Sequence, residues 1–334
     1  MFKIPRLKYP TSLCFEPIQL CNAQCTMCPY TTLQHEEGYR GKSMSTDQID
    51  NILDQFGYLI NKFKFEDEAL IVPYRYSDPL ITKNLENIFI KAKKYNYKVQ
   101  ITTNAVSLKK EKVKILNEYR NYLAEKIRIS IIGTNQFEVQ KYMKIDLNKT
   151  IINLKNVSEN FPELVSKFEI PIRGCNETKN DSENIKKLIE KINRMGFAAH
   201  PVSNWLVNRI SGEDTKIGEK NFVSGCKLFK YKVLKRMEIM VDGSVVLCCD
   251  DAYGHEKYGN VFENNIEKIW NSTLYEKHKD IFSEKFEDKK KNLFCNKCSR
   301  ATFNKRPYSN LKAISNFGIK NYIKKSFKNE IDYL

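Results

Sequence analysis

Short apolar runs alternate with amphipathic stretches from residue 13 to residue 202, and this alternation constrains the fold more than any other feature of the sequence. Each apolar run has the length of a strand, and the stretches between the runs carry apolar residues at helical spacing. Repeats of this kind are typical of a parallel sheet covered by helices, either barrel-like or doubly wound. The strands are expected at residues 13–20, 68–74, 97–103, 126–132, 167–173 and 196–202, with helices at 81–95, 109–124 and 181–195 and helical segments up to about residue 160.

Ser45 and Gln48 indicate where the helix after the first strand begins. They form an S-x-x-Q pattern at the start of "SMSTDQIDNILDQF". In such a capping box the Ser hydroxyl accepts a hydrogen bond from the backbone three residues on, and the Gln side chain reaches back to the Ser backbone. The sequence therefore predicts a helix N-terminus at Ser45.

The bulk composition indicates a folded chain in a reducing compartment. Hydrophobic residues make up 41% of the 334 residues, enough to bury a large core. The basic start MFKIPRLKYP is followed by no apolar signal region, and no uninterrupted apolar run has the length of a membrane span. We therefore expect a cytoplasmic protein. The formal net charge of +16 is spread over nearly every predicted helix, so we interpret it as a solvated surface and expect no nucleic-acid partner.

Three cysteines are clustered in "CNAQCTMCPY", namely Cys21, Cys25 and Cys28. Ten cysteines in a cytoplasmic chain argue for metal ligation or catalysis, because disulfides do not persist there. Four thiolates close a cubane iron–sulfur cluster, whereas three leave one iron able to bind another molecule. The loop directly follows the first strand, which places it at the C-terminal face of a barrel, where active sites lie. A zinc site with a remote fourth ligand and a chance spacing are the alternatives.

The spacing C-x-x-x-C-x-x-C on a loop after the first strand resembles the signature of the radical S-adenosylmethionine (radical SAM) family. The resemblance implies an α/β fold, with a partial (β/α)6 TIM-like barrel followed by a small twitch-type auxiliary-cluster domain. It also implies that Cys21, Cys25 and Cys28 hold a [4Fe–4S] cluster with S-adenosylmethionine on the open iron. Such an enzyme makes a 5′-deoxyadenosyl radical that takes hydrogen from a substrate, and its expected partner is a flavodoxin- or ferredoxin-type reductant.

Further segments resemble parts of the family's cofactor pocket. "YSDPL" stands where the family has a Gly-Gly-Glu-Pro-like segment whose backbone receives the methionine amino group. "TTNAVSL" resembles a T-N-G-x-x-L segment with Ala105 in place of Gly, and "SIIG" resembles the segment whose serine approaches the methionine carboxylate or the ribose. The residue before the third cysteine would present its backbone to adenine. The cofactor-binding residues that the resemblance implies are Met27, Tyr76, Ser77, Asp78, Asn104 and Ser130.

The sequence changes character after about residue 210, where two short apolar runs are joined by Asp242-Gly243, a strong hairpin signal. This part resembles the shortened auxiliary-cluster domain called twitch, within the broader SPASM group. The resemblance implies one closed auxiliary [4Fe–4S] cluster, with a structural zinc site as the alternative. Its expected ligands are Cys226, Cys295, Cys298 and one of Cys248 and Cys249; the Gly-x4-Cys step favours Cys248, with Cys249 unligated. The expected domains are 1–212 (barrel core), 213–300 (auxiliary domain) and 301–334, a basic tail that we expect to dock on the barrel rather than on a membrane.

Four other residues are candidates for contact with the substrate. Cys175 follows the fifth strand, where a thiol would return a hydrogen atom to a carbon radical, and the unligated Cys249 is a second such donor; a loop cysteine without a role is the alternative for Cys175. His200, at the end of the sixth strand, is a candidate base, with a structural histidine as the alternative. Arg173 is a candidate for binding a carboxylate or phosphate, with a structural salt bridge as the alternative.

The reaction that we predict is oxidation or epimerisation of a carbinol carbon in a sugar, aminocyclitol or nucleotide-sugar. Analogy with family members that have a short auxiliary domain, and the lack of a leader-binding domain before residue 13, favour a small carbohydrate substrate. Oxidation is slightly preferred, because an auxiliary cluster gives the electron a destination. A peptide-modifying radical SAM maturase is the enzymatic alternative. A non-catalytic zinc protein that contacts nucleic acid is the alternative from another class.

Overall fold

The chain divides into two compact units. The computed structural model describes residues 5–65, 69–174, 179–202, 225–226, 235–282, 301–302 and 331–333. Strand β2 (Ser12–Phe15) and helix α2 (Thr46–Phe63) cross the division between the units. The domain boundaries expected from the sequence stay predictions. The barrel unit comprises Phe15–Leu53 and Glu68–Asn208, and the auxiliary unit comprises Met1–Cys14, Asp54–Asp67 and Arg209–Leu334.

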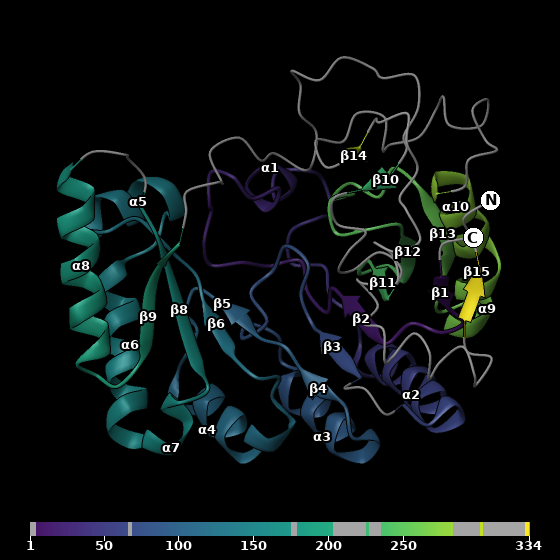
Figure 1. The fold of residues 1–334 in the computed structure, drawn as a ribbon, viewed down its shortest axis with the longest axis horizontal. Helices are drawn as coiled ribbons and strands as arrows, with labels where there is room; N and C mark the ends of the chain where they lie inside the picture. The colour runs from purple at the N-terminus through teal and green to yellow at the C-terminus, as the bar shows by residue number, and fades with distance from the viewer. Residues whose placement is uncertain are drawn as a thin grey trace. The chain divides into compact units, whose positions relative to one another are not determined.

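The barrel unit is built from parallel strands that alternate with helices along the chain (Figure 1). β3 pairs with β4, and β5 pairs with β6. β8 pairs with β6, β7 and β9, again in parallel. This arrangement confirms the α/β partial barrel expected from the sequence. The strands are β3 (Leu70–Val72), β4 (Lys98–Val99), β5 (Thr102–Thr103), β6 (Ile127–Ile129), β7 (Ile131–Ile132), β8 (Phe168–Arg173) and β9 (Ala198–Val202).

Helices pack against these strands and bury their apolar sides. α8 packs on β9 and α3 on β4, and Figure 1 shows α6 and α8 beside β8 and β9. Among the described residues, no helix combines the length and the apolar character that passage through a lipid bilayer requires. The helices are α1 (Tyr30–Leu33), α3 (Leu85–Tyr95), α4 (Lys110–Glu118), α5 (Gln136–Met143), α6 (Leu147–Asn160), α7 (Pro162–Val165) and α8 (Lys179–Asn193), with a 3-10 turn η1 (Arg120–Tyr122).

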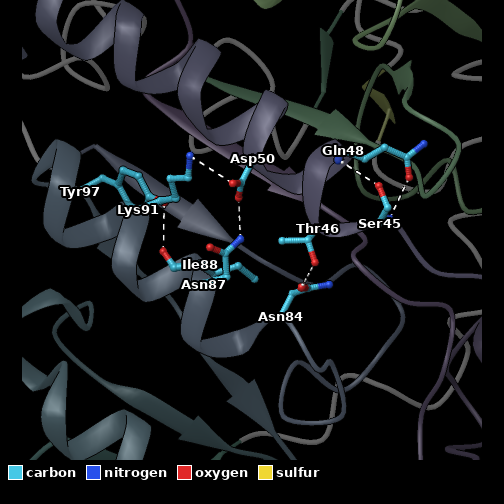
Figure 2. Close-up of polar contacts among 9 residues, drawn as sticks. All are labelled: Ser45, Thr46, Gln48, Asp50, Asn84, Asn87, Ile88, Lys91 and Tyr97. Atoms are coloured by element: carbon cyan, nitrogen blue, oxygen red, sulfur yellow. Dashed lines mark hydrogen bonds and ion pairs between the residues drawn. The ribbon is translucent and has the colours of Figure 1, made fainter.

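Helix α2 begins with the predicted capping box, which Figure 2 shows. The Gln48 backbone N–H donates to Ser45 Oγ (3.1 Å), and the Ser45 N–H donates to Gln48 Oε1 (2.9 Å). One turn on, Asp50 accepts a hydrogen bond from Asn87 Nδ2 (2.5 Å) and forms an ion pair with Lys91 Nζ (3.4 Å), both on α3. The helix start predicted at Ser45 is therefore confirmed, and side chains of the first turns tie α2 to α3.

Three expected strands differ from those in the structure, and one of them, 126–132, is divided at Ser130 into β6 and β7. The expected strand 13–20 ends before Pro17, because proline has no N–H to donate to a sheet. The expected strand 97–103 is divided into β4 and β5, because its partner changes along its length. The Gln100 N–H donates to an oxygen of β3, whereas the Ile101 carbonyl accepts from β6. A pattern of apolar residues predicts a strand but does not show which neighbour each residue pairs with.

The auxiliary unit contains the predicted hairpin. β11 and β12 pair in antiparallel fashion, and Gly243 in the turn between them has φ +81°. Three further pairs are also antiparallel: β12 with β13, β10 with β14, and β1 with β15. Trp270 is fully buried and donates through Nε1 to Leu7 O at 2.8 Å. The elements are β1 (Pro5–Leu7), β10 (Gly225–Cys226), β11 (Arg236–Ile239), β12 (Ser244–Val246), β13 (Lys257–Asn260), α9 (Ile266–Asn271), α10 (Thr273–Phe282), β14 (Ala301–Thr302) and β15 (Ile331–Tyr333).

Candidate active site

The loop after β2 carries the clustered cysteines and is held by hydrogen bonds at several points. The Cys28 N–H donates to Cys25 O (2.9 Å), and the Thr31 hydroxyl donates to the same carbonyl oxygen (2.7 Å). The Thr26 N–H donates to the carbonyl of Tyr142 on α5 (2.9 Å). The loop conformation is therefore fixed both by its own turn and by a neighbouring helix.

The three thiols are half-buried and share one electrostatic environment. Burial, followed by the charge of Asp78, raises the pKa of Cys21 to about 12, and burial raises the pKa of Cys28 to about 11. The pKa of Cys25 is raised first by burial and then by the charges of Cys28 and Cys21. The charge of Cys28 thus affects both Cys21 and Cys25, so the three sulfur atoms lie near one another. Three thiolates there require a positive partner such as iron.

The donor set fits an iron–sulfur cluster better than a single ion. Among the described residues, no three His, Cys, Asp or Glu side chains approach one another closely enough to hold one metal ion. In a cubane cluster each thiolate binds a different iron, so the ligands stand farther apart than the donors around one ion. Cys21, Cys25 and Cys28 are soft donors that lie near one another, and they suit a cluster with one open iron.

Asn104, just after β5, links that strand to the cysteine loop. Its Nδ2 donates to Asn22 Oδ1 at 2.6 Å and lies 3.9 Å from Cys21 Sγ. Its Oδ1 accepts from the Val106 N–H (2.9 Å), and its backbone oxygen accepts from the Thr150 hydroxyl (3.1 Å). Both ends of the amide are engaged within the protein, so Asn104 positions the first cysteine. Its contact with the cofactor stays a prediction.

Asp78 lies in the segment expected to receive the methionine amino group and is 2% exposed. Its Oδ2 accepts from the Thr103 hydroxyl (2.7 Å) and the Asn104 N–H (3.2 Å), and its Oδ1 accepts from the Leu80 N–H (3.0 Å). Burial raises the pKa of Asp78, and these hydrogen bonds oppose that shift. With both oxygen atoms occupied, the side chain joins the segment after β3 to the end of β5.

Ser77, beside Asp78, carries a buried hydroxyl with no hydrogen-bond partner among the described residues. A buried polar group of this kind is costly and indicates a partner that binds there. The Asp78 N–H donates to Leu20 O (3.2 Å), so this segment lies against the start of the cysteine loop. Tyr76 and Met27 are half-buried in the segment and in the loop. The Ser77 hydroxyl is therefore open to a ligand, and its contact with the cofactor stays a prediction.

Sequence reasoning missed Glu16, which is 1% exposed just after β2. Its carboxylate accepts from Gln19 Nε2 (3.1 Å), the Tyr39 hydroxyl (3.5 Å) and the Tyr76 N–H (3.4 Å). Burial raises the pKa of Glu16, and the charge of Arg75 is the largest opposing effect. The signal was a carboxylate inside the apolar run "LCFEPIQL". Glu16 joins the start of the cysteine loop to the segment of Tyr76.

Ser130, Arg173 and His200 lie on one face of the parallel strands, which we name the inner face. His200 pairs with Pro171, and Arg173 pairs with Val202. β6 and β7 pair with β8 in the same register, so Ser130, between them, lies opposite Pro171. Pro171 thus has Ser130 on one side and His200 on the other. Ser130 and His200 are therefore level with each other, and Arg173 lies nearer the carboxyl end of β8. Their roles toward cofactor and substrate stay predictions.

Two further residues of the inner face were also missed. Arg128 Nε lies 3.1 Å from Glu169 Oε2, and His200 Nε2 lies 3.8 Å from Glu169 Oε1. Register places Arg128 opposite Glu169 on the neighbouring strand. The signal was a charged residue at an alternate position in each of the runs "KIRISII" and "KFEIPIR". His200 is therefore held beside a carboxylate that an arginine also holds.

In the auxiliary unit, Cys248 and Cys249 follow β12 and are half-buried. Arg236 is buried on β11 with its Nη2 2.6 Å from Glu238 Oε1. Burial alone would lower the pKa of Arg236, but the charges of Glu238, Cys14 and Cys249 raise it above its usual value. Cys249 therefore lies near a buried guanidinium. The predicted site residues whose side chains lie outside the described part of the chain are Cys175, Cys226, Cys295 and Cys298.

Two family models match the chain. The model described as the Radical SAM superfamily matches residues 15–189, more than half of the chain. The model described as SPASM, an iron–sulfur cluster-binding domain, matches residues 226–299. No curated protein matches the chain in sequence.

Solved structures with low sequence identity share the fold. BtrN in complex with AdoMet and 2-DOIA is 15% identical with a TM-score of 0.52, over 90% of this chain and 95% of that chain. Streptococcus suis SuiB bound to precursor peptide SuiA is 17% identical with a TM-score of 0.58, over 88% of this chain and 70% of that chain. Native anSMEcpe with bound AdoMet is 15% identical with a TM-score of 0.53, over 96% of this chain and 98% of that chain.

The first match runs from the end of β2 into α8 and contains the cysteine loop, the Asp78 segment, Asn104 and part of the inner face. The second contains the β11–β12 hairpin with its two cysteines. Together they confirm the resemblance seen in the sequence and set aside a non-catalytic zinc protein. The chain belongs to the radical SAM superfamily, as an S-adenosylmethionine-binding iron–sulfur enzyme with a C-terminal SPASM cluster-binding domain.

Proposed function

We propose that Cys21, Cys25 and Cys28 hold a [4Fe–4S] cluster whose open iron binds S-adenosylmethionine. The observation that best supports this assignment is the connection from Cys21 through Asn104 to Asp78, which ties the cysteine loop to the ends of β3 and β5. A loop anchored in this way keeps the three thiols in place before metal binds. When bound, the cluster and S-adenosylmethionine supply a 5′-deoxyadenosyl radical that takes a hydrogen atom from the substrate.

The residues around the loop orient S-adenosylmethionine. Met27 presents its backbone to adenine, and the backbone of Tyr76 and Ser77 receives the methionine amino group. The buried Ser77 hydroxyl, which has no partner among the described residues, gains one in the cofactor. Ser130 contacts the methionine carboxylate or the ribose, and Asn104 holds the cysteine loop against these groups. Preorganised contacts of this kind reduce the reorganisation that binding requires.

We assign the reaction to oxidation of a carbinol carbon in a sugar, aminocyclitol or nucleotide-sugar. Conversion to the carbonyl removes a hydrogen atom from carbon, a proton from the hydroxyl and one electron. His200, on the inner face beside Glu169, is the group that takes the proton. One auxiliary [4Fe–4S] cluster, with Cys226, Cys248, Cys295 and Cys298 as ligands, supplies an acceptor for the electron. A flavodoxin- or ferredoxin-type protein is the external reductant.

Epimerisation is the second outcome at the same carbon. It requires a thiol that returns a hydrogen atom from the opposite face, and Cys175 or Cys249 is the donor. A Cys175→Ala variant that completes turnover excludes Cys175 and favours oxidation, or donation by Cys249. A variant that makes 5′-deoxyadenosine without product, or an oxidised product where the native product is inverted, favours epimerisation.

A peptide substrate, modified as by a radical SAM maturase, is the second candidate class. SuiB, which shares the fold, is described as bound to precursor peptide SuiA. At 17% identity this likeness concerns the fold alone, so it does not choose between the classes. The neighbouring genes distinguish them: genes for glycosyltransferases and sugar-nucleotide enzymes support a carbohydrate, and a gene for a short precursor peptide supports the maturase.

Iron content and cofactor cleavage of the anaerobically reconstituted protein test the proposal. We expect about eight irons, in two cubane clusters, and about half of that in a variant with Ala at Cys21, Cys25 and Cys28. Reduced protein should release 5′-deoxyadenosine from S-adenosylmethionine, and Cys28→Ala should abolish the release. Cys14→Ala, at a buried cysteine of β2 outside both predicted ligand sets, is the matched control and should retain iron and cleavage. Cleavage that persists in Cys28→Ala, or a native iron content of no more than about four, contradicts the assignment.

A further inference from the structure

The inner face of the barrel unit is charged, although the opposite face of the same strands is apolar. Side chains alternate along a strand, so neighbours in sequence face opposite ways. The strands concerned, β6, β8 and β9, lie side by side (Figure 1). The inner face carries Arg128, Glu169, Arg173 and His200. The fully buried residues of the opposite face are Ile127, Ile129, Phe168, Ile170 and Ile172.

Glu169 contacts two of the other three polar side chains of the inner face. It lies 3.1 Å from Arg128 Nε through one oxygen and 3.8 Å from His200 Nε2 through the other. The carboxylate therefore offsets part of the charge of Arg128 and restrains its side chain. One negative charge cannot also balance Arg173, which leaves the inner face with a net positive charge.

Arg173 has no such ion pair among the described residues. Its Nε is inaccessible to solvent and has no hydrogen-bond partner in the part of the chain that the structure describes. Burial, and then the charge of Arg128, hold the pKa of Arg173 below its usual value. A guanidinium nevertheless stays charged at neutral pH. A half-buried cation with an unused donor is costly unless an anion binds it.

We propose that Arg173 and Arg128 form an anion site on the inner face that recognises a carboxylate or phosphate group of the substrate, and that Glu169 limits its strength. Arg173 lies at the carboxyl end of β8, where ligands bind in parallel α/β folds. The planar guanidinium of Arg173 can bind a carboxylate or a phosphate through two hydrogen bonds. Arg128 adds positive charge from the adjacent strand β6, opposite Glu169, which precedes Arg173 by four residues. The inference rests on the proposed function and specifies its substrate class, a carbinol that also carries an anionic group.

Thermal unfolding of the anaerobically reconstituted protein tests the site, with inorganic phosphate as the probe at constant ionic strength. A ligand that binds only the folded state stabilises it by RT ln(1 + [L]/Kd), so the unfolding temperature begins to rise as the ligand concentration approaches Kd. We expect a concentration-dependent rise for the native protein and its loss in Arg173→Gln. Arg120→Gln, which removes an exposed arginine of η1 in the same unit, is the matched control and should keep the rise. Acetate in a second series distinguishes the two anions, because the anion that fits better raises the unfolding temperature at a lower concentration.

Two further variants keep the test decisive if Arg173→Gln does not fold. Arg173→Lys keeps the charge without the planar fork, so the same rise in unfolding temperature should need several-fold more phosphate. Glu169→Gln removes the charge that offsets Arg128, so the same rise should need a few-fold less phosphate. A native protein that does not respond to either anion, or the same response in all inner-face variants, overturns the proposal. These measurements require no turnover, so their failure is distinct from a failure to release 5′-deoxyadenosine.

Discussion

The amide nitrogen of Asn104 donates a 2.6 Å hydrogen bond to Asn22 Oδ1 and lies 3.9 Å from the sulfur of Cys21. Asn22 Nδ2 in turn donates to Ser107 Oγ at 2.8 Å, on the segment that contains Asn104. Two asparagine side chains thus join the segment after β5 to the first cysteine of the loop. This connection predicts that the stability of the first cluster depends on a residue that is not expected to bind iron.

Asn104→Ala removes this connection and leaves Asn22 Oδ1 without its donor. The variant also loses the hydrogen bond that Asn104 Oδ1 accepts from the Val106 N–H, so we expect a decrease of about 1–3 kcal/mol in the free energy of unfolding. We also expect several-fold faster loss of cluster absorbance when a chelator is added. Asn121→Ala, at an exposed position of η1, is the control and should change neither quantity. Equal rates of cluster loss in both variants would contradict a positioning role for Asn104.

Asp78→Asn tests whether the carboxylate serves as an anchor for three donors. Its Oδ2 accepts two hydrogen bonds and its Oδ1 accepts one, so an NH2 group at either position must face a backbone N–H. We expect a decrease of about 1–3 kcal/mol in the free energy of unfolding, measured by denaturant titration. Asp146→Asn, at the N-cap of α6, should change it by less than about 0.5 kcal/mol, because Asn caps helices as well as Asp. A similar effect in both variants would contradict the anchor.

The cysteine spacing, the capping box at Ser45 and the Asp242-Gly243 turn could be predicted because each depends on residues close together in sequence. Glu16 could not, because its partners Tyr39 and Tyr76 come from two other segments. A lone carboxylate after an apolar run indicates burial but does not identify those partners. Only the fold shows that it lies between the cysteine loop and the segment after β3.

The sequence also could not predict which charged residues of the inner face lie opposite one another, because that depends on strand register. Arg128 and Glu169 each stand at an alternate position of a strand, which predicts the face on which they lie. Their pairing depends on the offset between β6 and β8, and that offset is set by packing of distant segments. His200 and Arg173 were predicted as separate candidates for the same reason. The structure adds that both belong to one charged surface.

Gly243 in the auxiliary hairpin offers a test of turn geometry with a matched control. Its φ is +81°, and a Cβ atom there would lie 2.4 Å from a ring carbon of Phe262 and 2.5 Å from Asn260 Oδ1. Gly41 has a φ of +82°, with nothing within 4 Å of a Cβ atom. Gly41→Ala should therefore cost about 1–2 kcal/mol from the backbone alone. Gly243→Ala should cost a further ~1–3 kcal/mol from the clash. If the unfolding curves of Gly41→Ala and Gly243→Ala coincide, the turn at Gly243 relaxes to accept the methyl group and the predicted clash is wrong.

Cys248 and Cys249 are adjacent, and their environments predict different roles. Cys248 stands five residues after Gly243, at the Gly-x4-Cys step expected of a cluster ligand. Cys249 lies near Arg236, whose pKa its charge helps to raise against the effect of burial. A thiol beside a buried guanidinium already has a positive neighbour. We therefore expect Cys248 to bind the auxiliary cluster and Cys249 to remain unligated near Arg236.

Single variants at these two positions serve as controls for each other. Cys248→Ala should lose about half of the iron of the reconstituted protein, because only one of two cubane clusters depends on it. Cys249→Ala should retain all of it. Both variants should keep the signal of S-adenosylmethionine bound at the first cluster, since Cys21, Cys25 and Cys28 are unchanged. Iron loss in Cys249→Ala with full iron in Cys248→Ala would reverse the assignment and make Cys248 the thiol available for hydrogen donation.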